Sequence, residues 1–119
     1  MRAGQISEGK SILLDYDFRE AKLIYIHLGT NDIEKIGNIE NVAKDLVNLG
    51  NLAKMQNPNA KVILSEIPIR KDYLNERRIE VNNLLRKSLP ESINIVFHDN
   101  ITADMLYDKN ILKNLVFIT

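Results

Sequence analysis

The chain has 119 residues, 45% of them hydrophobic and 27% charged, and its 16 basic and 16 acidic residues cancel. This length and composition predict one soluble globular domain that buries roughly two-thirds of the surface of its unfolded chain. The balanced charge excludes a global field that would draw the protein to nucleic acid or to an anionic membrane.

The sequence contains no cysteine, which excludes disulfides, thiolate nucleophiles and cysteine-based metal sites. No apolar stretch approaches the roughly 20 residues of a membrane helix, and no signal-peptide core follows Met1. We therefore predict a cytoplasmic protein without membrane contact and without a cofactor.

The first third of the chain predicts a short helix and a buried strand. Apolar positions recur at helical spacing from residue 5 to about 14. Residues 23–28 (LIYIHL) form an apolar run that is typical of a strand buried on both faces of a parallel sheet. Gly29 permits a sharp turn after it, and Asn31 and Asp32 place an amide and a carboxylate there. Ligands of open α/β sheets bind at such carboxyl ends of strands.

The middle of the chain predicts two helices around a second strand. A loop follows Asp32, and Asn38 is placed to cap a helix that runs to about residue 56. Gly50 lies inside this helix and costs about 1 kcal/mol relative to alanine, so we expect its second half to bend or fray. Residues 61–66 (KVILSE) predict the strand, and Asp72 is expected to cap a helix that runs to about residue 88.

The last third predicts a third strand over residues 93–98 (INIVFH), and residues 115–119 (LVFIT) are also β-prone. Helices and strands alternate along the whole chain, and the connections are short enough for right-handed crossovers. The expected fold is α/β, with a parallel sheet of about three strands in a single domain over residues 1–119.

Three stretches resemble the SGNH hydrolases, also called GDSL-type esterases. Residues 26–32 (IHLGTND) are similar to the family's third block, glycine-x-asparagine-aspartate after a central strand. Residues 64–70 (LSEIPIR) resemble the strand that follows, and residues 105–112 (MLYDKNIL) the last block, aspartate-x-x-histidine before leucine. Residues 2–6 (RAGQI) are similar in outline to the second block, so the resemblance covers nearly the whole chain.

The resemblance implies a three-layer αβα, flavodoxin-like fold and ester hydrolysis by Ser-His-Asp chemistry. Fixed donors that face the developing oxyanion supply a large electrostatic term in such a reaction. The implied oxyanion donors are Gly4 and Asn31, and the implied residual acid is Asp108. The implied binding residues are Gly29, Thr30 and Asp32, and the implied ligand is a small acyl ester.

Two catalytic members are absent. The sequence has no glycine-aspartate-serine motif, and Ile111 stands three residues after Asp108, where the family has histidine. Isoleucine cannot accept a proton, so a serine would not be activated. An oxyanion hole and binding site alone retain about 10³–10⁴-fold over water. We therefore expect a domain of the esterase family that is inactive as the chain stands; the alternative is a non-catalytic binding or interaction module.

The missing block also affects the predicted sheet. The family's strand order is 2-1-3-4-5, and this chain has counterparts of strands 3, 4 and 5 only. Residues 23–28 would then form an unpaired edge, which invites pairing with another chain. We expect this edge to be covered by a missing N-terminal segment of a longer product, by a partner, or by a second copy in a homo-oligomer. Residues 115–119 are the internal alternative.

Each candidate residue also has a structural interpretation. Asn31 can cap the turn, Asp32 can bond to local amides, and Asp108 without its histidine can be a solvated turn residue. His27 and His98 lie near aspartates, but hydrogen-bonded histidines are expected more often than a metal site.

No motif places a histidine for Ser65, which argues against it as a nucleophile. The basic pairs at residues 70–71, 77–78 and 86–87 have acids close by, so we expect solvated faces rather than nucleic-acid binding.

Overall fold

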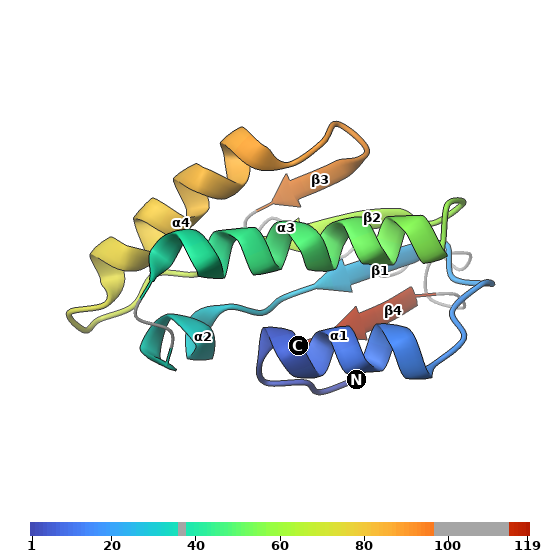
Figure 1. Ribbon diagram of the computed structural model, residues 1–119, viewed down its shortest axis with the longest axis horizontal. Helices are drawn as coiled ribbons and strands as arrows, with labels where there is room; N and C mark the ends of the chain where they lie inside the picture. The colour runs from blue at the N-terminus through green and yellow to red at the C-terminus, as the bar shows by residue number, and fades with distance from the viewer. Residues whose placement is uncertain (36–37, 97–114) are drawn as a thin grey trace.

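The computed structural model describes residues 1–35, 38–96 and 115–119. These ranges contain four helices and four strands, which in chain order are α1 (Ile6–Asp15), β1 (Leu23–Ile26), α2 (Thr30–Lys35), α3 (Ile39–Gln56), β2 (Lys61–Ser65), α4 (Asn75–Ser88), β3 (Ile93–Val96) and β4 (Leu115–Ile118). The strands form one sheet in the order β3-β2-β1-β4, and every neighbouring pair is parallel (Figure 1). The predicted α/β class with a parallel sheet is therefore confirmed.

The main core lies between the sheet and the helices on one of its faces. Side chains alternate along each strand. Ile24 and Leu64 belong to the cluster shared with α1, α3 and α4, whereas Tyr25 and Ile63 belong to a second cluster. Figure 1 shows α1, α3 and α4 on the same side of the sheet. Of the three layers that we expected, the described residues thus show the sheet and one helical layer.

Strand β1 has a hydrogen-bonded neighbour on each side. Tyr25 is in register with Ile63 of β2 and with Phe117 of β4, and the rings of Tyr25 and Phe117 lie 4.6 Å apart. The prediction of an unpaired edge at residues 23–28 is therefore wrong. The β-prone segment at residues 115–118 pairs with this edge, as in the internal alternative given above. In this position Ile118 is completely buried.

The helix boundaries correct two further expectations. Asn38 caps α3 as predicted, since its side chain accepts the N–H groups of residues 40 and 41. However, α3 continues through Gly50 to its end at residue 56. A Cβ at Gly50 would lie 3.2 Å from Ile93, so the glycine permits close packing of α3 on β3. Helix α4 begins at Asn75, and Asp72 instead accepts the N–H of Leu74 in the preceding turn.

The two ends of the chain hydrogen-bond to each other. The N–H groups of Ala3 and Gly4 donate to the carbonyl oxygen of Thr119 at 2.7 and 3.1 Å. In return, the N–H of Thr119 donates to the carbonyl of Met1 at 3.0 Å. Both ends therefore lie together in Figure 1, and this pairing holds Gly4 at the carboxyl end of β4.

Several predicted features lie outside the described residues, namely the end of the third strand with His98 and Asp99, and the stretch that contains Asp108 and Ile111. Within the described ranges, no helix has the length and apolar character needed to span a bilayer.

Candidate functional site

The chain turns sharply at Gly29, between β1 and α2. Gly29 has a φ of +122°, and a Cβ there would lie 2.8 Å from Cδ1 of Ile67 and 3.2 Å from Cδ1 of Leu46. Only glycine combines this φ with such close packing. The turn leads directly into α2, so residues 30–35 are helical rather than the open loop that we expected after Asp32.

Asn31 lies in the first turn of α2 and contacts the N-terminal segment. Its Nδ2 donates to the carbonyl oxygen of Gly4 at 2.9 Å, although the two residues are 27 positions apart. Gly4 has a φ of +80°, and its own N–H is bonded to Thr119. The two residues that the resemblance implies as oxyanion donors are therefore brought together at one edge of the sheet. The Gly4 amide is already used within the chain, whereas an asparagine amide has a second N–H.

Asp32 is buried and bonds to a distant helix. Both of its carboxylate oxygens accept the N–H of Ile6, at 3.3 and 3.2 Å. The side chain of Gln5, the N-cap residue of α1, makes no capping hydrogen bond. Asp32 therefore supplies from α2 the acceptor that the start of α1 needs. This long-range bond is added to the local one that we expected, since the Asp32 carboxylate also accepts a hydrogen bond from its own backbone.

The environment of Asp32 makes its charged form less favourable than that of an exposed aspartate. Burial of the carboxylate raises the pKa of Asp32, and the hydrogen bond from Ile6 partly opposes this shift. The nearby charge of Asp45 raises the pKa of Asp32 further, while Lys35 lowers it. Asp32 thus combines a structural bond with a charge that the fold accommodates poorly.

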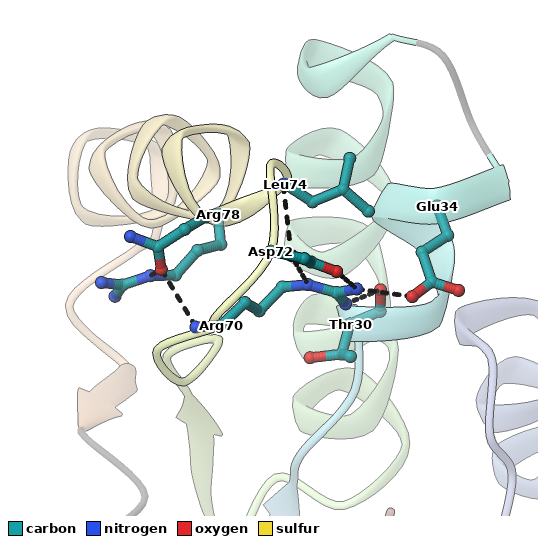
Figure 2. A network of polar contacts seen from close by, with 7 residues as sticks. Thr30, Glu34, Arg70, Asp72, Leu74 and Arg78 are labelled. Atoms are coloured by element: carbon teal, nitrogen blue, oxygen red, sulfur yellow. Dashed lines mark hydrogen bonds and ion pairs between the residues drawn. The ribbon is translucent and has the colours of Figure 1, made fainter.

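Arg70 connects the segments that follow β1 and β2 (Figure 2). Its Nε and Nη2 bind the two oxygens of Asp72 at 2.9 and 2.6 Å, and Nη2 also binds Glu34 at 2.5 Å. Its Nη1 donates to the carbonyl of Thr30 at 3.1 Å. The side chain is 12% exposed, and these two carboxylates raise the pKa of Arg70. The network fixes α2, and hence Asn31, against the loop after β2.

Sequence reasoning gave no role to Arg70 or to Asn82. Arg70 closes the stretch that resembles the family's strand with a proline-arginine turn, and that position was the available signal. Asn82, on α4, binds both backbone groups of Ile67: its Oδ1 accepts the N–H at 2.9 Å and its Nδ2 donates to the carbonyl at 3.0 Å. These side chains hold the loop after β2 from two directions.

Ser65 and Glu66 lie at the end of β2 and are both buried. The Oγ of Ser65 donates to the carbonyl of Glu66 at 3.1 Å, which uses the hydroxyl locally. Glu66 forms a 2.5 Å ion pair with Arg86 on α4.

The backbone N–H of His27 donates to the carbonyl oxygen of Ile118 at 2.8 Å. Among the residues described, no three histidine, aspartate or glutamate side chains are grouped as a metal site would require.

No family model matches the chain, and no curated protein or solved structure matches it.

Proposed function

We propose that this chain is an SGNH-type, esterase-like domain that no longer hydrolyses esters and acts as a non-catalytic binding module for a small acyl ester. The observation that carries the proposal is the contact between Nδ2 of Asn31 and the carbonyl of Gly4. Two short motifs far apart in the sequence supply the two groups, and both lie at the carboxyl edge of a parallel sheet, where such sites form.

The sheet order supports the same ancestry. If β1, β2 and β3 correspond to the family's third, fourth and fifth strands, β4 occupies the place of the first strand. In the family the nucleophilic serine follows that first strand. Here the residue after β4 is Thr119, and its carbonyl accepts the N–H of Gly4. The N–H of Gly4, which the resemblance implies as an oxyanion donor, thus binds the carbonyl oxygen of Thr119 in the same chain.

The side chains support the proposed loss of hydrolysis. A Ser-His-Asp reaction needs a hydroxyl and a base within hydrogen-bond reach. Ser65, the one serine at the carboxyl end of a described strand, is buried and bonded to Glu66. Ile111 holds the position of the base in the sequence. The remaining function of this edge is to offer the exposed Asn31 amide to a carbonyl ligand.

Binding and hydrolysis can be measured separately. We expect no release of product from short p-nitrophenyl esters and no labelling by a fluorophosphonate probe. Stoichiometric labelling would show a working nucleophile and would overturn the proposal. Ethyl butyrate should shift the NMR signal of the Asn31 side-chain amide, and Asn31→Ala should abolish binding. The matched control is Asn41→Ala, an exposed asparagine on α3, which should leave binding unchanged.

A reconstruction tests the ancestry itself. One variant carries Gly-Asp-Ser in place of Thr119, a second carries Ile111→His, and a third carries both changes. We expect fluorophosphonate labelling of the third variant only, because nucleophile and base act as a unit. Equal labelling of the first and third variants, or none in a folded third variant, would contradict the proposed correspondence of β4 with the family's first strand.

A further inference from the structure

A groove of about 650 Å³ lies between α1 and α3, and Asp32 and Lys35 of α2 also line it. This volume is in the range of small-molecule sites, about 300–1,000 Å³. The groove lies beside the Asn31–Gly4 contact: neither residue lines it, but their chain neighbours Gln5 and Asp32 do.

The lining of the groove along α3 begins polar and ends apolar, with Leu49 and Asn51 between. Its lining residues on α3 follow one face of that helix. Asp45 and Asn48 come first, and Leu52 and Met55 come last. The 11 residues from Asp45 to Met55 span roughly 15 Å of helix. Lys35, from α2, joins the polar end.

The apolar end is more exposed than such side chains usually are. Met55 is 73% exposed, although it borders the half-buried Leu52 and the buried Leu49. A methionine side chain is flexible and polarisable, so it adapts to the shape of an apolar ligand. Covering Met55 and Leu52 would remove apolar surface from water, which favours binding of an alkyl group.

The charges that line the groove balance. Lys10 and Lys35 are matched by Asp32 and Asp45, and Asp32 is also bonded to Ile6. For a charged ligand, the attraction to the two side chains of opposite charge would therefore be offset by repulsion from the two of like charge. The amides of Asn48 and of the other polar lining residues offer both donors and acceptors. This composition favours an uncharged head group that can hydrogen-bond.

We infer that this groove binds a small uncharged amphiphile, with its polar head beside Asp45 and Asn48 and its alkyl chain along Leu52 and Met55. The roughly 15 Å from Asp45 to Met55 sets the combined length of the head and chain that the groove takes. The inference does not depend on the esterase-like ancestry, because the contact between Asn31 and Gly4 takes no part in it and Asp32 enters only as one of the charges that line the groove.

The test uses hexyl, octyl and decyl glucosides below their critical micelle concentrations, with titration calorimetry and NMR of the whole chain. We expect binding to tighten about fourfold for each added methylene. The perturbed amides should lie on the facing sides of α1 and α3. Affinity that does not depend on chain length, or perturbations confined to other surfaces, would overturn the inference.

A pair of matched variants locates the alkyl chain. Met55→Gln changes an exposed groove residue on α3, and Leu14→Gln changes a 56% exposed residue on α1 that does not line the groove. We expect the first to weaken decyl glucoside binding at least threefold and the second to leave it unchanged. Equal effects of the two variants would contradict the placement. Decanoate and decyltrimethylammonium should both bind more weakly than decyl glucoside, and tighter binding of either would exclude an uncharged head.

Discussion

Asp32 accepts the N–H of Ile6 with both carboxylate oxygens and so ties the start of α1 to the start of α2. The two helices are joined at the carboxyl edge of the sheet, beside the contact between Asn31 and Gly4. In the glycine-x-asparagine-aspartate motif, Asp32 therefore joins two helices, whereas the neighbouring Asn31 is exposed.

Removing the acceptor should destabilise the fold. Asp32→Ala leaves the N–H of Ile6 buried without a partner, and we expect a loss of about 1–2 kcal/mol in the free energy of unfolding. Asp32→Asn retains a side-chain oxygen and should lose less than half as much. Urea unfolding at neutral pH measures both variants. Equal losses would show that the hydrogen bond contributes nothing.

The raised pKa of Asp32 gives a prediction for pH. Its ordinary value is 3.8, and burial raises it. The folded chain therefore binds this proton more tightly than the unfolded chain does. The resulting stability is fully present below pH 3.8 and is lost as the pH rises through the raised pKa.

Comparison with Asp32→Asn isolates this group from the other carboxylates. The stability of the parent chain relative to Asp32→Asn should fall as the pH rises from 3.8. Asp45→Asn removes a charge that raises the pKa of Asp32. In that background, the relative stability should therefore fall over a narrower range of pH above 3.8. A relative stability that rises with pH would contradict the assignment. Urea unfolding across this pH range is the measurement.

The two glycines with positive φ should differ in their tolerance of alanine. Gly29→Ala combines backbone strain with a 2.8 Å approach to the buried Ile67, and we expect it to cost about 2–4 kcal/mol. No heavy atom lies within 4 Å of a Cβ at Gly4, so Gly4→Ala carries only the strain, about 1 kcal/mol. Thermal unfolding of the two variants should separate packing from strain.

Arg70 should not be replaceable by lysine. A lysine has one ammonium group and cannot reproduce the bonds to Asp72, Glu34 and the Thr30 carbonyl at once. We expect Arg70→Lys to lower the free energy of unfolding by about 1–2 kcal/mol and to broaden the NMR signal of the Asn31 amide. Arg19→Lys is the control. Arg19 is 83% exposed in its pair with Asp17, so its replacement should not measurably change stability. Similar effects at both sites would argue against a fixed Arg70 network.

The pairing of β4 with β1 can be tested through Ile118. This side chain is completely buried, so Ile118→Ala should cost about 2–4 kcal/mol. Ile69→Ala, at a position that is 78% exposed, should cost little. The disruptive Ile118→Asp should release β4, expose the edge of β1 and increase self-association with concentration. Analytical ultracentrifugation that shows no such increase would contradict the role of β4 as the cover of that edge.

The sequence predicts the elements whose signals are local. Each of the predicted segments at residues 23–28, 61–66 and 93–98 contains a strand, because each is rich in apolar and β-branched residues over the length of a strand. The cap at Asn38 and the turn at Gly29 are equally local, since they depend on one side chain or on its absence.

The features that could not be predicted involve partners far apart in the chain. The bond from Asp32 to Ile6 joins residues 26 positions apart, and no spacing rule indicates that an aspartate will cap another helix. The ion pair of Arg70 with Glu34 spans 36 positions. The β-prone segment at residues 115–118 was recognisable, but its place beside β1 depends on which strand edge the rest of the fold leaves open.

The hydrogen bonds among residues 1–4 and Thr119 hold the two ends of the chain next to each other. A linker of a few residues could join the two ends with a small loss of chain entropy, because they are already held together. The backbone could then be cut elsewhere, for example in the exposed turn at Pro58 and Asn59. Such a circular permutant would begin with β2, end with α3, and retain the same four parallel strands.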